Sequence, residues 1–413
     1  MAAISSRSGD LRNYALVTGA YWADTIADGA TRVLVLFYFY ERGYSPFEVA
    51  SLFLFYELFG IITNLVGGWL AARLGLRSTL LMGLATQLVA LGMLAVAPSA
   101  WLVVPYVMAA QALSGIAKDL TKMSSKSAVK LVAPADAPDA LFRWVAVLTG
   151  SKNALKGVGF FLGGLLLTVA GFRSALAVLM ALVFAALVVV LVLVRGELGR
   201  PDRSARFAHM FSNNRAVNIL AAARLFLFAA RDVWFVVGLP VFLRTELGWS
   251  FWQAGAFLAV WVIGYGIVQA LTPGLARARA DGTGAHPGGR TATVLAFALA
   301  AFPAAMAIAL HAGLDPALVV IAGLAAFGVV FALNSTVHSY LILAYADRAR
   351  VAMNVGFYYM ANAGGRLTGT VLSGLLYQWK GIEACLWASA AFVLVAGLLS
   401  LLLPHRAGQP AAG

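Results

Sequence analysis

Long apolar runs constrain the fold of this sequence more than any other feature. Of its 413 residues, 62% are hydrophobic and only 11% are charged, whereas about a quarter of a soluble domain is charged. Runs long enough to cross a bilayer fall at residues 14–40, 47–71, 79–97, 101–121, 142–170, 174–194, 216–243, 252–276, 291–311, 317–343, 353–377 and 383–403. In lipid a spanning segment must satisfy its own backbone polar groups. The pattern therefore predicts an all-α polytopic membrane protein with twelve transmembrane helices.

A hydrophilic stretch at 195–215 divides these helices into two sets of six. We therefore predict an N-terminal bundle over 1–194, a linker over 195–215 and a C-terminal bundle over 216–413. A weak internal repeat supports two related halves: Gly43-Tyr44-Ser45 begins the second helix, and Gly248-Trp249-Ser250 begins the eighth. Asp28 and Asp232 are rough counterparts. Six-plus-six repeats of this kind place a binding site near the bilayer midplane, between the halves.

The basic residues outside the helices predict the orientation. The formal net charge is +13, which in a membrane protein reflects cytoplasmic loops rather than nucleic-acid binding. With an even number of helices both termini share a side, and the other side carries only Arg42, Arg173, Arg244 and Lys380. Both termini, and the linker 195–215, are therefore expected in the cytoplasm.

Enzyme and cofactor motifs are missing from the sequence. It contains no HExxH, GxSxG or P-loop pattern, and its single cysteine, Cys385, lies in an apolar run. We expect no enzyme activity, no cofactor and no metal, and the missing P-loop argues against ATP-driven pumping.

Seven bases lie within the apolar runs, where a charge at a helix centre costs roughly 2.5–3.5 kcal/mol. They are Arg32, Lys118, Lys152, Lys156, Arg224, Arg231 and Arg366. Five acids share this depth, namely Asp24, Asp28, Glu57, Asp119 and Asp232. Seven minus five leaves two positive charges in excess, which favours an anionic ligand in a wet cavity.

Lysines recur every four residues in two stretches, a spacing that keeps side chains on one helix face. These are Lys118, Lys122, Lys126 and Lys130, and then Lys152 and Lys156. We interpret Lys126 and Lys130 as cytoplasmic anchors. Asp119 is expected to pair with Lys122 at i,i+3, which leaves Lys118 as the stronger ligand candidate of that stretch. Lys152 and Lys156 have no acid within helical reach and are the first candidates to contact the anion.

Two further helices carry candidate ligand residues. Arg224 and Arg231 are seven apart and share a face, while Asp232 is expected to point elsewhere. For Arg224 we favour contact with the ligand. For Arg231 a structural pairing with the first helix is also possible. A polar stripe with four-residue spacing predicts cavity lining along 353–377: Asn354, Tyr358, Asn362, Arg366 and Thr370. Asn334 is a further substrate-binding candidate, whereas His338 is expected to be a structural hydrogen bonder.

The acids supply the candidates for proton coupling. Asp28 and Arg32 have the i,i+4 spacing of an acid–base pair; they are either such a structural pair, which would leave Asp24 freer to carry a proton, or residues of the site. Glu57 serves either in coupling or in a hydrogen bond between helices. These three acids are our proton-coupling candidates.

Two motifs resemble signatures of the major facilitator superfamily. GGWLAARLGLR at 67–77 is similar to the loop signature Gly-x-x-x-Asp-Arg-x-Gly-Arg-Arg/Lys, with Ala72 in place of Asp. GFFLGG at 159–164 resembles the end of the antiporter signature Gly-Pro-x-x-Gly-Gly, with Phe160 in place of Pro. The resemblance implies the major facilitator fold and secondary active transport.

Longer segments resemble one family within it, the ArsJ permeases of bacterial arsenic-resistance operons. They are LFLFYELFGIITNLVGGWLAARLGL, QALSGIAKDLTKM, LTGSKNALKGVGFFLGG, AARLFLFAARDVWFVV and WVIGYGIVQ. The resemblance implies export of 1-arseno-3-phosphoglycerate across the inner membrane, with a glyceraldehyde-3-phosphate dehydrogenase as functional partner. We expect a monomer.

Other functions remain open on the sequence. A drug/proton antiporter of the same superfamily would be expected to line its cavity with acids and aromatics, whereas the excess here is basic. An exporter of another phosphorylated metabolite fits the bases equally well. A membrane enzyme lacks a motif, and a sensor or scaffold would not need so many bases near the midplane.

Overall fold

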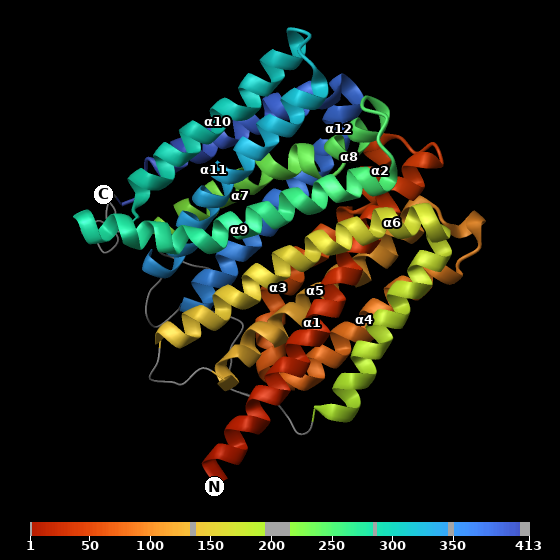
Figure 1. Cartoon of the computed structure of the whole chain (residues 1–413), viewed down its shortest axis with the longest axis vertical. Helices are drawn as coiled ribbons and strands as arrows, with labels where there is room; N and C mark the ends of the chain where they lie inside the picture. The colour runs from red at the N-terminus through yellow and green to blue at the C-terminus, as the bar shows by residue number, and fades with distance from the viewer. Residues whose placement is uncertain (1, 133–137, 195–214, 284–286, 346–350, 405–413) are drawn as a thin grey trace. The chain divides into compact units, whose positions relative to one another are not determined.

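The computed structural model describes residues 2–132, 138–194, 215–283, 287–345 and 351–404. The described residues are helical apart from short connections, as predicted (Figure 1). The first six α-helices are α1 (Ala2–Glu41), α2 (Pro46–Leu52), α3 (Leu54–Leu74), α4 (Leu76–Val96), α5 (Val104–Val132) and α6 (Pro138–Leu193). The remaining six are α7 (Arg215–Phe235), α8 (Gly238–Thr245), α9 (Phe251–Thr283), α10 (Gly289–His311), α11 (Pro316–Tyr345) and α12 (Val351–Ser400).

Two of these helices each contain two predicted spans. α6 turns at Gly171, whose φ of 74° lies in the left-handed region, and α12 turns at Lys380 and Gly381. Conversely, α2 with α3, and α7 with α8, each correspond to one predicted span. Eight stretches of the described residues are long and apolar enough to cross a membrane, and two of them, of 43 and 47 residues, contain the two turns. This arrangement fits twelve spans, and the exact number stays a prediction.

The described chain groups into two compact units that do not follow the sequence halves. Unit 1 contains Met1–Tyr38, Ile62–Phe207 and Phe251–Ile263; unit 2 contains Phe39–Ile61, Ala208–Ser250 and Gly264–Gly413. A segment of the first half thus belongs to unit 2, and a segment of the second half belongs to unit 1. The domain boundaries at 194 and 215 stay a prediction, since residues 195–214 lie outside the described residues.

Small residues allow close helix packing in unit 1. A Cβ added at Gly159 of α6 would lie 2.5 Å from the carbonyl oxygen of Ile26 in α1, and one at Gly163 would lie 2.5 Å from that of Ala30. α4 packs against both α5 and α6. Packing of this kind, with small residues at the contact, is typical of helices in membranes.

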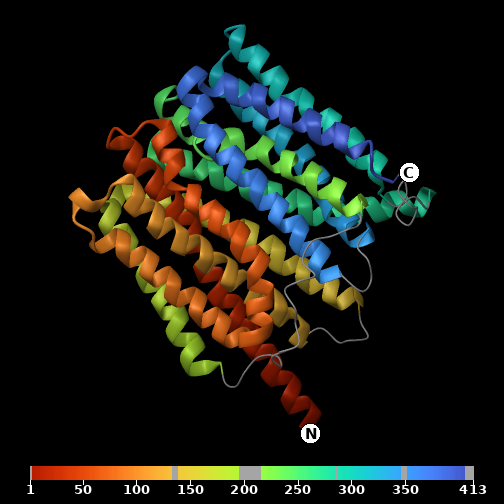
Figure 2. The ribbon, with the colours of Figure 1, turned by 180° about the vertical axis from the view of Figure 1, so that it is seen from behind.

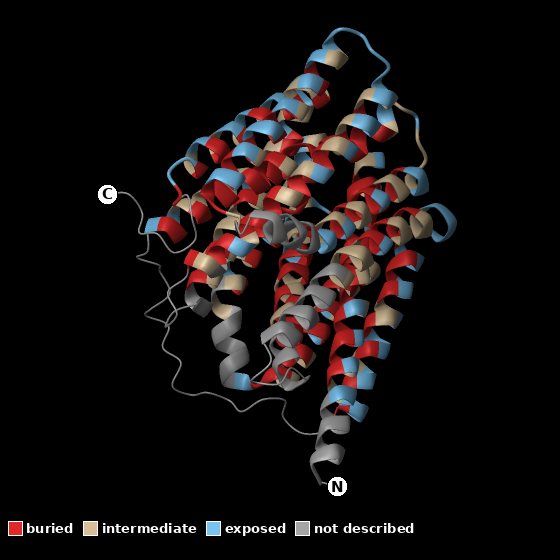
Figure 3. Ribbon diagram, turned by 60° about the vertical axis from the view of Figure 1, so that its left-hand side comes forward, coloured by how far each residue is buried: buried red, intermediate tan, exposed pale blue. Residues whose placement is uncertain are grey.

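Unit 2 is organised around α12. This helix packs along α7, as is visible from behind (Figure 2), and also contacts α10 and α2. A Cβ at Gly365 would collide with the backbone of Leu225 in α7, so only glycine allows this approach. Burial follows stripes along the helices (Figure 3). Large side chains such as Trp234, Phe327 and Phe331 are fully buried.

The two helices that begin with the internal repeat start in similar ways. Gly43 and Gly248 have φ of 87° and 66°, values that favour glycine. Ser45 caps α2 in a capping box: its Oγ accepts from the Glu48 backbone N–H, and a Glu48 carboxylate oxygen accepts from the Ser45 backbone N–H. The two segments that join the opposite units, Phe39–Ile61 and Phe251–Ile263, contain or follow these turns.

Candidate functional site

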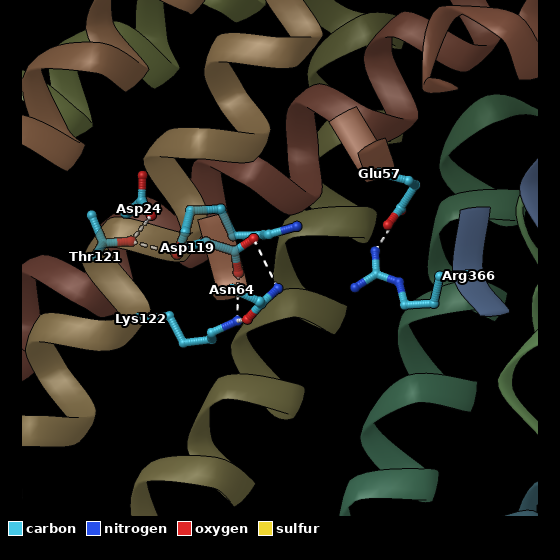
Figure 4. A network of polar contacts seen from close by, with 8 residues as sticks. Asp24, Glu57, Asn64, Asp119, Thr121, Lys122 and Arg366 are labelled. Carbon is cyan, nitrogen blue, oxygen red and sulfur yellow. Dashed lines mark hydrogen bonds and ion pairs between the residues drawn. The ribbon is translucent and has the colours of Figure 1, made fainter. Parts of the chain in front are cut away.

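An ion pair in unit 2 joins Glu57 of α3 to Arg366 of α12. Arg366 donates from Nη2 to Glu57 Oε1 at 2.6 Å, and the two side chains point toward one another (Figure 4). The Glu57 side chain is only 1% exposed. Of the two functions expected for Glu57, the structure shows the contact between helices. Arg366 also lies 3.6 Å from a carboxylate oxygen of Asp232, so two acids surround this base.

Arg231 and Asp232 of α7 form an ion pair with each other. Arg231 Nη2 lies 2.5 Å from Asp232 Oδ1, and its Nε donates to the same oxygen. The expectation that Asp232 points away from Arg231 is therefore wrong. The long arginine side chain bends back to its neighbour, and its guanidinium lies over the ring of Phe228 at 4.8 Å. The possible pairing of Arg231 with the first helix stays a prediction.

Arg224 is held differently from the other two arginines. It is 5% exposed and donates from Nε to Oδ1 of Asn362 at 3.0 Å. Its Nη1 donates to the carbonyl oxygen and to Oγ of Ser335, both at 3.0 Å. Its guanidinium lies 4.1 Å from the ring centre of Phe228 and 5.1 Å from that of Tyr358. Asn362, Tyr358 and Arg224, all predicted site residues, therefore meet in unit 2.

The partners of Arg224 are all neutral, and within the described part of the chain Arg224 forms no ion pair. Ser335 is itself held in place, since Gln269 donates to its Oγ at 3.2 Å and Tyr265 Oη lies 3.3 Å from it. A buried guanidinium without a carboxylate is costly. The arrangement leaves one positive charge available to an anion.

Two polar side chains of α11 lie within one helical turn of Ser335. Asn334 and His338 are both 0% exposed. Among the described residues, neither amide atom of Asn334 and neither ring nitrogen of His338 has a hydrogen-bond partner. The expectation that His338 is a structural hydrogen bonder is therefore not met in the described structure.

The first lysine stretch is only partly available to a ligand. Lys122 Nζ lies 2.5 Å from Asp119 Oδ1, which confirms the predicted i,i+3 pair. Asn64 of α3 closes this group: it accepts from Lys122 and donates to Asp119 at 3.2 Å (Figure 4). The side chains of Lys126 and Lys130 lie outside the described residues.

Asp24 of α1 is buried in unit 1, with 1% of its surface exposed. Its Oδ2 accepts a hydrogen bond from Thr121 Oγ1 at 2.6 Å, whereas Oδ1 has no partner among the described residues. Lys118 is close enough to act on Asp24 electrostatically. Asp28 and Arg32 are also buried on α1, and their mutual pairing stays a prediction.

The second lysine stretch lies on α6 in unit 1. Lys152 and Lys156 are partly exposed. The Nζ of Lys156 lies 5.5 Å from the ring centre of Phe160. Their contact with an anion stays a prediction, as does that of Lys118.

Several polar partners were not predicted from the sequence. Asn64 and Thr121 lie 55 and 97 residues from the acids that they contact, so no helical spacing connects them. Tyr265 and Gln269 do carry a signal, since they are four residues apart on one face of α9. In the described residues no group of three His, Cys, Asp or Glu side chains is placed to hold a metal.

The family of the chain follows from comparison with known proteins. A model of the major facilitator superfamily matches residues 17–346. The chain belongs to this superfamily. Its members are secondary transporters, and the protein is accordingly a multi-pass membrane transporter. A search of curated proteins gave no match.

Two solved transporter structures show the same fold. A D-xylose–proton symporter matches with a TM-score of 0.70 and 17% identity, covering 97% of this chain and 98% of that one. A POT family transporter in complex with a thioalcohol-conjugated peptide matches with a TM-score of 0.73 and 12% identity, covering 94% and 95%. At these identities the likeness shows the fold alone.

The Glu57–Arg366 pair gives a test of the polar network in this transporter. Arg366→Gln leaves Glu57 buried without its nearest cation, which costs about 3–5 kcal/mol. Glu57→Gln/Arg366→Gln removes both charges, so we expect the double variant to unfold at a higher temperature than Arg366→Gln. Thermal unfolding of the purified variants measures this. If the losses of melting temperature in Glu57→Gln and in Arg366→Gln simply added up in the double variant, the two side chains would not interact.

Proposed function

We propose that this superfamily member exports a small organic anion, and that Arg224 binds the anionic group. The observation that carries the proposal is the burial of Arg224 among neutral partners. Arg231 and Arg366 are neutralised by Asp232 and Glu57, so these two acids balance two of the three arginines and leave the charge of Arg224. An oxyanion at Arg224 would balance the remaining charge. An arginine is also well suited to phosphate and carboxylate oxygens.

The lysines of unit 1 are proposed as further contacts for an anionic cargo. Lys152 and Lys156 remain the first candidates, together with Lys118. Because Lys122 is occupied by Asp119 and Asn64, we give it a supporting function.

The cargo is proposed to be 1-arseno-3-phosphoglycerate, with another phosphorylated metabolite as the alternative. This choice depends on the resemblance of the sequence to the ArsJ family. The cargo has an acyl arsenate at one end and a phosphate at the other, which suits two basic groups. A glyceraldehyde-3-phosphate dehydrogenase would supply it by using arsenate in place of phosphate.

The proposed setting is the inner membrane of a bacterium, with both termini in the cytoplasm and the protein acting as a monomer. The orientation depends on the excess of Lys and Arg on the side of the termini. A cysteine introduced at Ala312 is then expected to react with an impermeant reagent on intact cells. Protection of that cysteine would argue for the opposite orientation.

Replacing Arg224 tests the anion site directly. Arg224→Gln removes a charge-assisted contact worth roughly 1.5–3 kcal/mol, so the apparent affinity should fall about ten- to hundredfold. The measurement is uptake of 3-phosphoglycerate, a stable analogue of the proposed cargo, into inside-out vesicles. Arg244→Gln is the matched control, because its ion pair with Glu41 is partly exposed and should contribute little. Unchanged affinity in Arg224→Gln would exclude this site.

Replacing Asp24 tests proton coupling. Asp24 is a buried carboxylate with one oxygen free of described partners, so it is our proposed proton carrier. Asp24→Asn should abolish accumulation driven by a pH gradient yet keep downhill exchange in the same vesicles. Thr121→Val removes the hydrogen bond but keeps the carboxylate, so it should still accumulate the analogue. Accumulation against a gradient by Asp24→Asn would show that the proton travels elsewhere.

Growth of an arsenic-sensitive host tests the cargo. If the cargo is the arsenylated ester, resistance to arsenate should require this protein and a suitable dehydrogenase together. No protection against arsenite is expected, because arsenite is uncharged near neutral pH and offers no anion to these bases. Growth on arsenate is compared between hosts that carry each gene alone and a host that carries both. A host with the Arg224→Gln variant and the dehydrogenase is the control. Resistance to arsenite, or arsenate resistance without any such dehydrogenase, would reject this cargo.

A further inference from the structure

We propose that Asn334 and His338 of α11 bind a hydroxyl group of the cargo next to its anionic group at Arg224. This inference rests on the proposed function, because it concerns the same site in unit 2. It names a chemical feature of the cargo that the bases alone do not indicate. The two side chains are fully buried, and neither has a hydrogen-bond partner among the described residues.

The positions of the two side chains place them at the Arg224 site. Asn334 and His338 are four residues apart, so they share one face of α11. Ser335 lies between them and accepts two hydrogen bonds from Arg224. The charge of Arg224 also acts electrostatically on His338. Both side chains therefore lie within one helical turn of Ser335, the residue that accepts from Arg224.

Arg224 itself has a donor group that remains available. Its Nε and Nη1 donate to Asn362 and Ser335, whereas Nη2 donates to none of the residues that the structure describes. A guanidinium Nη2 carries two N–H groups. An oxyanion is thus expected to bind at this nitrogen, while Phe228 and Tyr358 cover the guanidinium.

The chemistry of Asn334 and His338 indicates what lies beside the oxyanion. A carboxamide offers both donors and an acceptor, and a neutral imidazole offers one donor and one acceptor. A fully ionised phosphate or carboxylate accepts hydrogen bonds but donates none, so it would leave the Asn and His acceptors unsatisfied. A hydroxyl both donates and accepts, so it can accept from the Asn334 amide and the His338 N–H and donate to one of their two acceptors. A buried site built for a hydroxyl rejects an analogue that lacks it.

Two probes that differ only in this hydroxyl test the proposal. They are 3-phosphoglycerate and 3-phosphonooxypropanoate, which has the same carboxylate and phosphate but no hydroxyl. Equilibrium binding is measured with the purified full chain in lipid nanodiscs. The wild type is expected to bind 3-phosphoglycerate about tenfold more tightly or better.

Variants then assign the preference to these residues. Asn334→Leu and His338→Leu should each reduce the ratio of the two affinities toward one, mainly by weakening the binding of 3-phosphoglycerate. His338→Gln keeps a donor and an acceptor and should retain part of the ratio. Asn218→Leu, at an exposed position on α7, is the matched control and should leave the ratio unchanged.

The outcomes separate this proposal from the proposed function. Equal binding of both probes by the wild type would overturn the hydroxyl site but leave the anion site intact. A preference that persists in Asn334→Leu and His338→Leu would overturn the assignment to these residues. Binding of neither probe would overturn the proposed anion cargo and this inference with it. If a leucine variant fails to fold, the ratio of the two probe affinities in the wild type and in His338→Gln still tests the proposal.

Discussion

The free-energy cost of burying a charge in a membrane protein is the constraint on which the polar interior of this protein depends. For Arg231 and Arg366 this cost is offset by ion pairs with Asp232 and Glu57. For Lys122 it is offset by an ion pair with Asp119 and a hydrogen bond to Asn64. Arg224 differs from these bases, because all of its hydrogen bonds to the described residues are made with neutral groups. A transporter must bind its cargo reversibly, and an arginine without a resident acid is able to exchange an anion from solution. An arginine already paired to a buried carboxylate would first have to break that pair.

The same ion pairs connect segments that are far apart in the sequence. Phe39–Ile61 belongs to the first half of the chain but is part of unit 2, where Glu57 meets Arg366 across 309 residues. In unit 1, Phe251–Ile263 packs on α6, where a Cβ at Gly164 would collide with the Phe251 backbone. One segment is thus fixed by charge as well as by packing, the other by small residues. A change at Glu57 would therefore alter how a first-half segment is held in unit 2.

Helix positions and one ion pair could be predicted from the sequence, because both depend on local spacing. The apolar runs predicted the positions of the helices, and three-residue spacing on a helix predicted the ion pair between Lys122 and Asp119. Contacts that depend on which helices become neighbours could not be predicted. Asn64 and Ser335 reach their partners across 58 and 111 residues, and no periodicity encodes that. The Arg231–Asp232 prediction was wrong for another reason: helical spacing describes where Cβ atoms point, whereas a long guanidinium can fold back to the adjacent residue.

The central claim is that Arg224 binds the anionic group of the cargo. The most direct measurement is a cryo-electron microscopy structure of the protein in nanodiscs with 3-phosphoglycerate bound. Our account predicts density for a phosphate or carboxylate within hydrogen-bond distance of Arg224 Nη2, with the Glu57–Arg366 pair still formed. Density at Arg366 with its ion pair broken, and Arg224 left in contact with Asn362 and Ser335 alone, would contradict it.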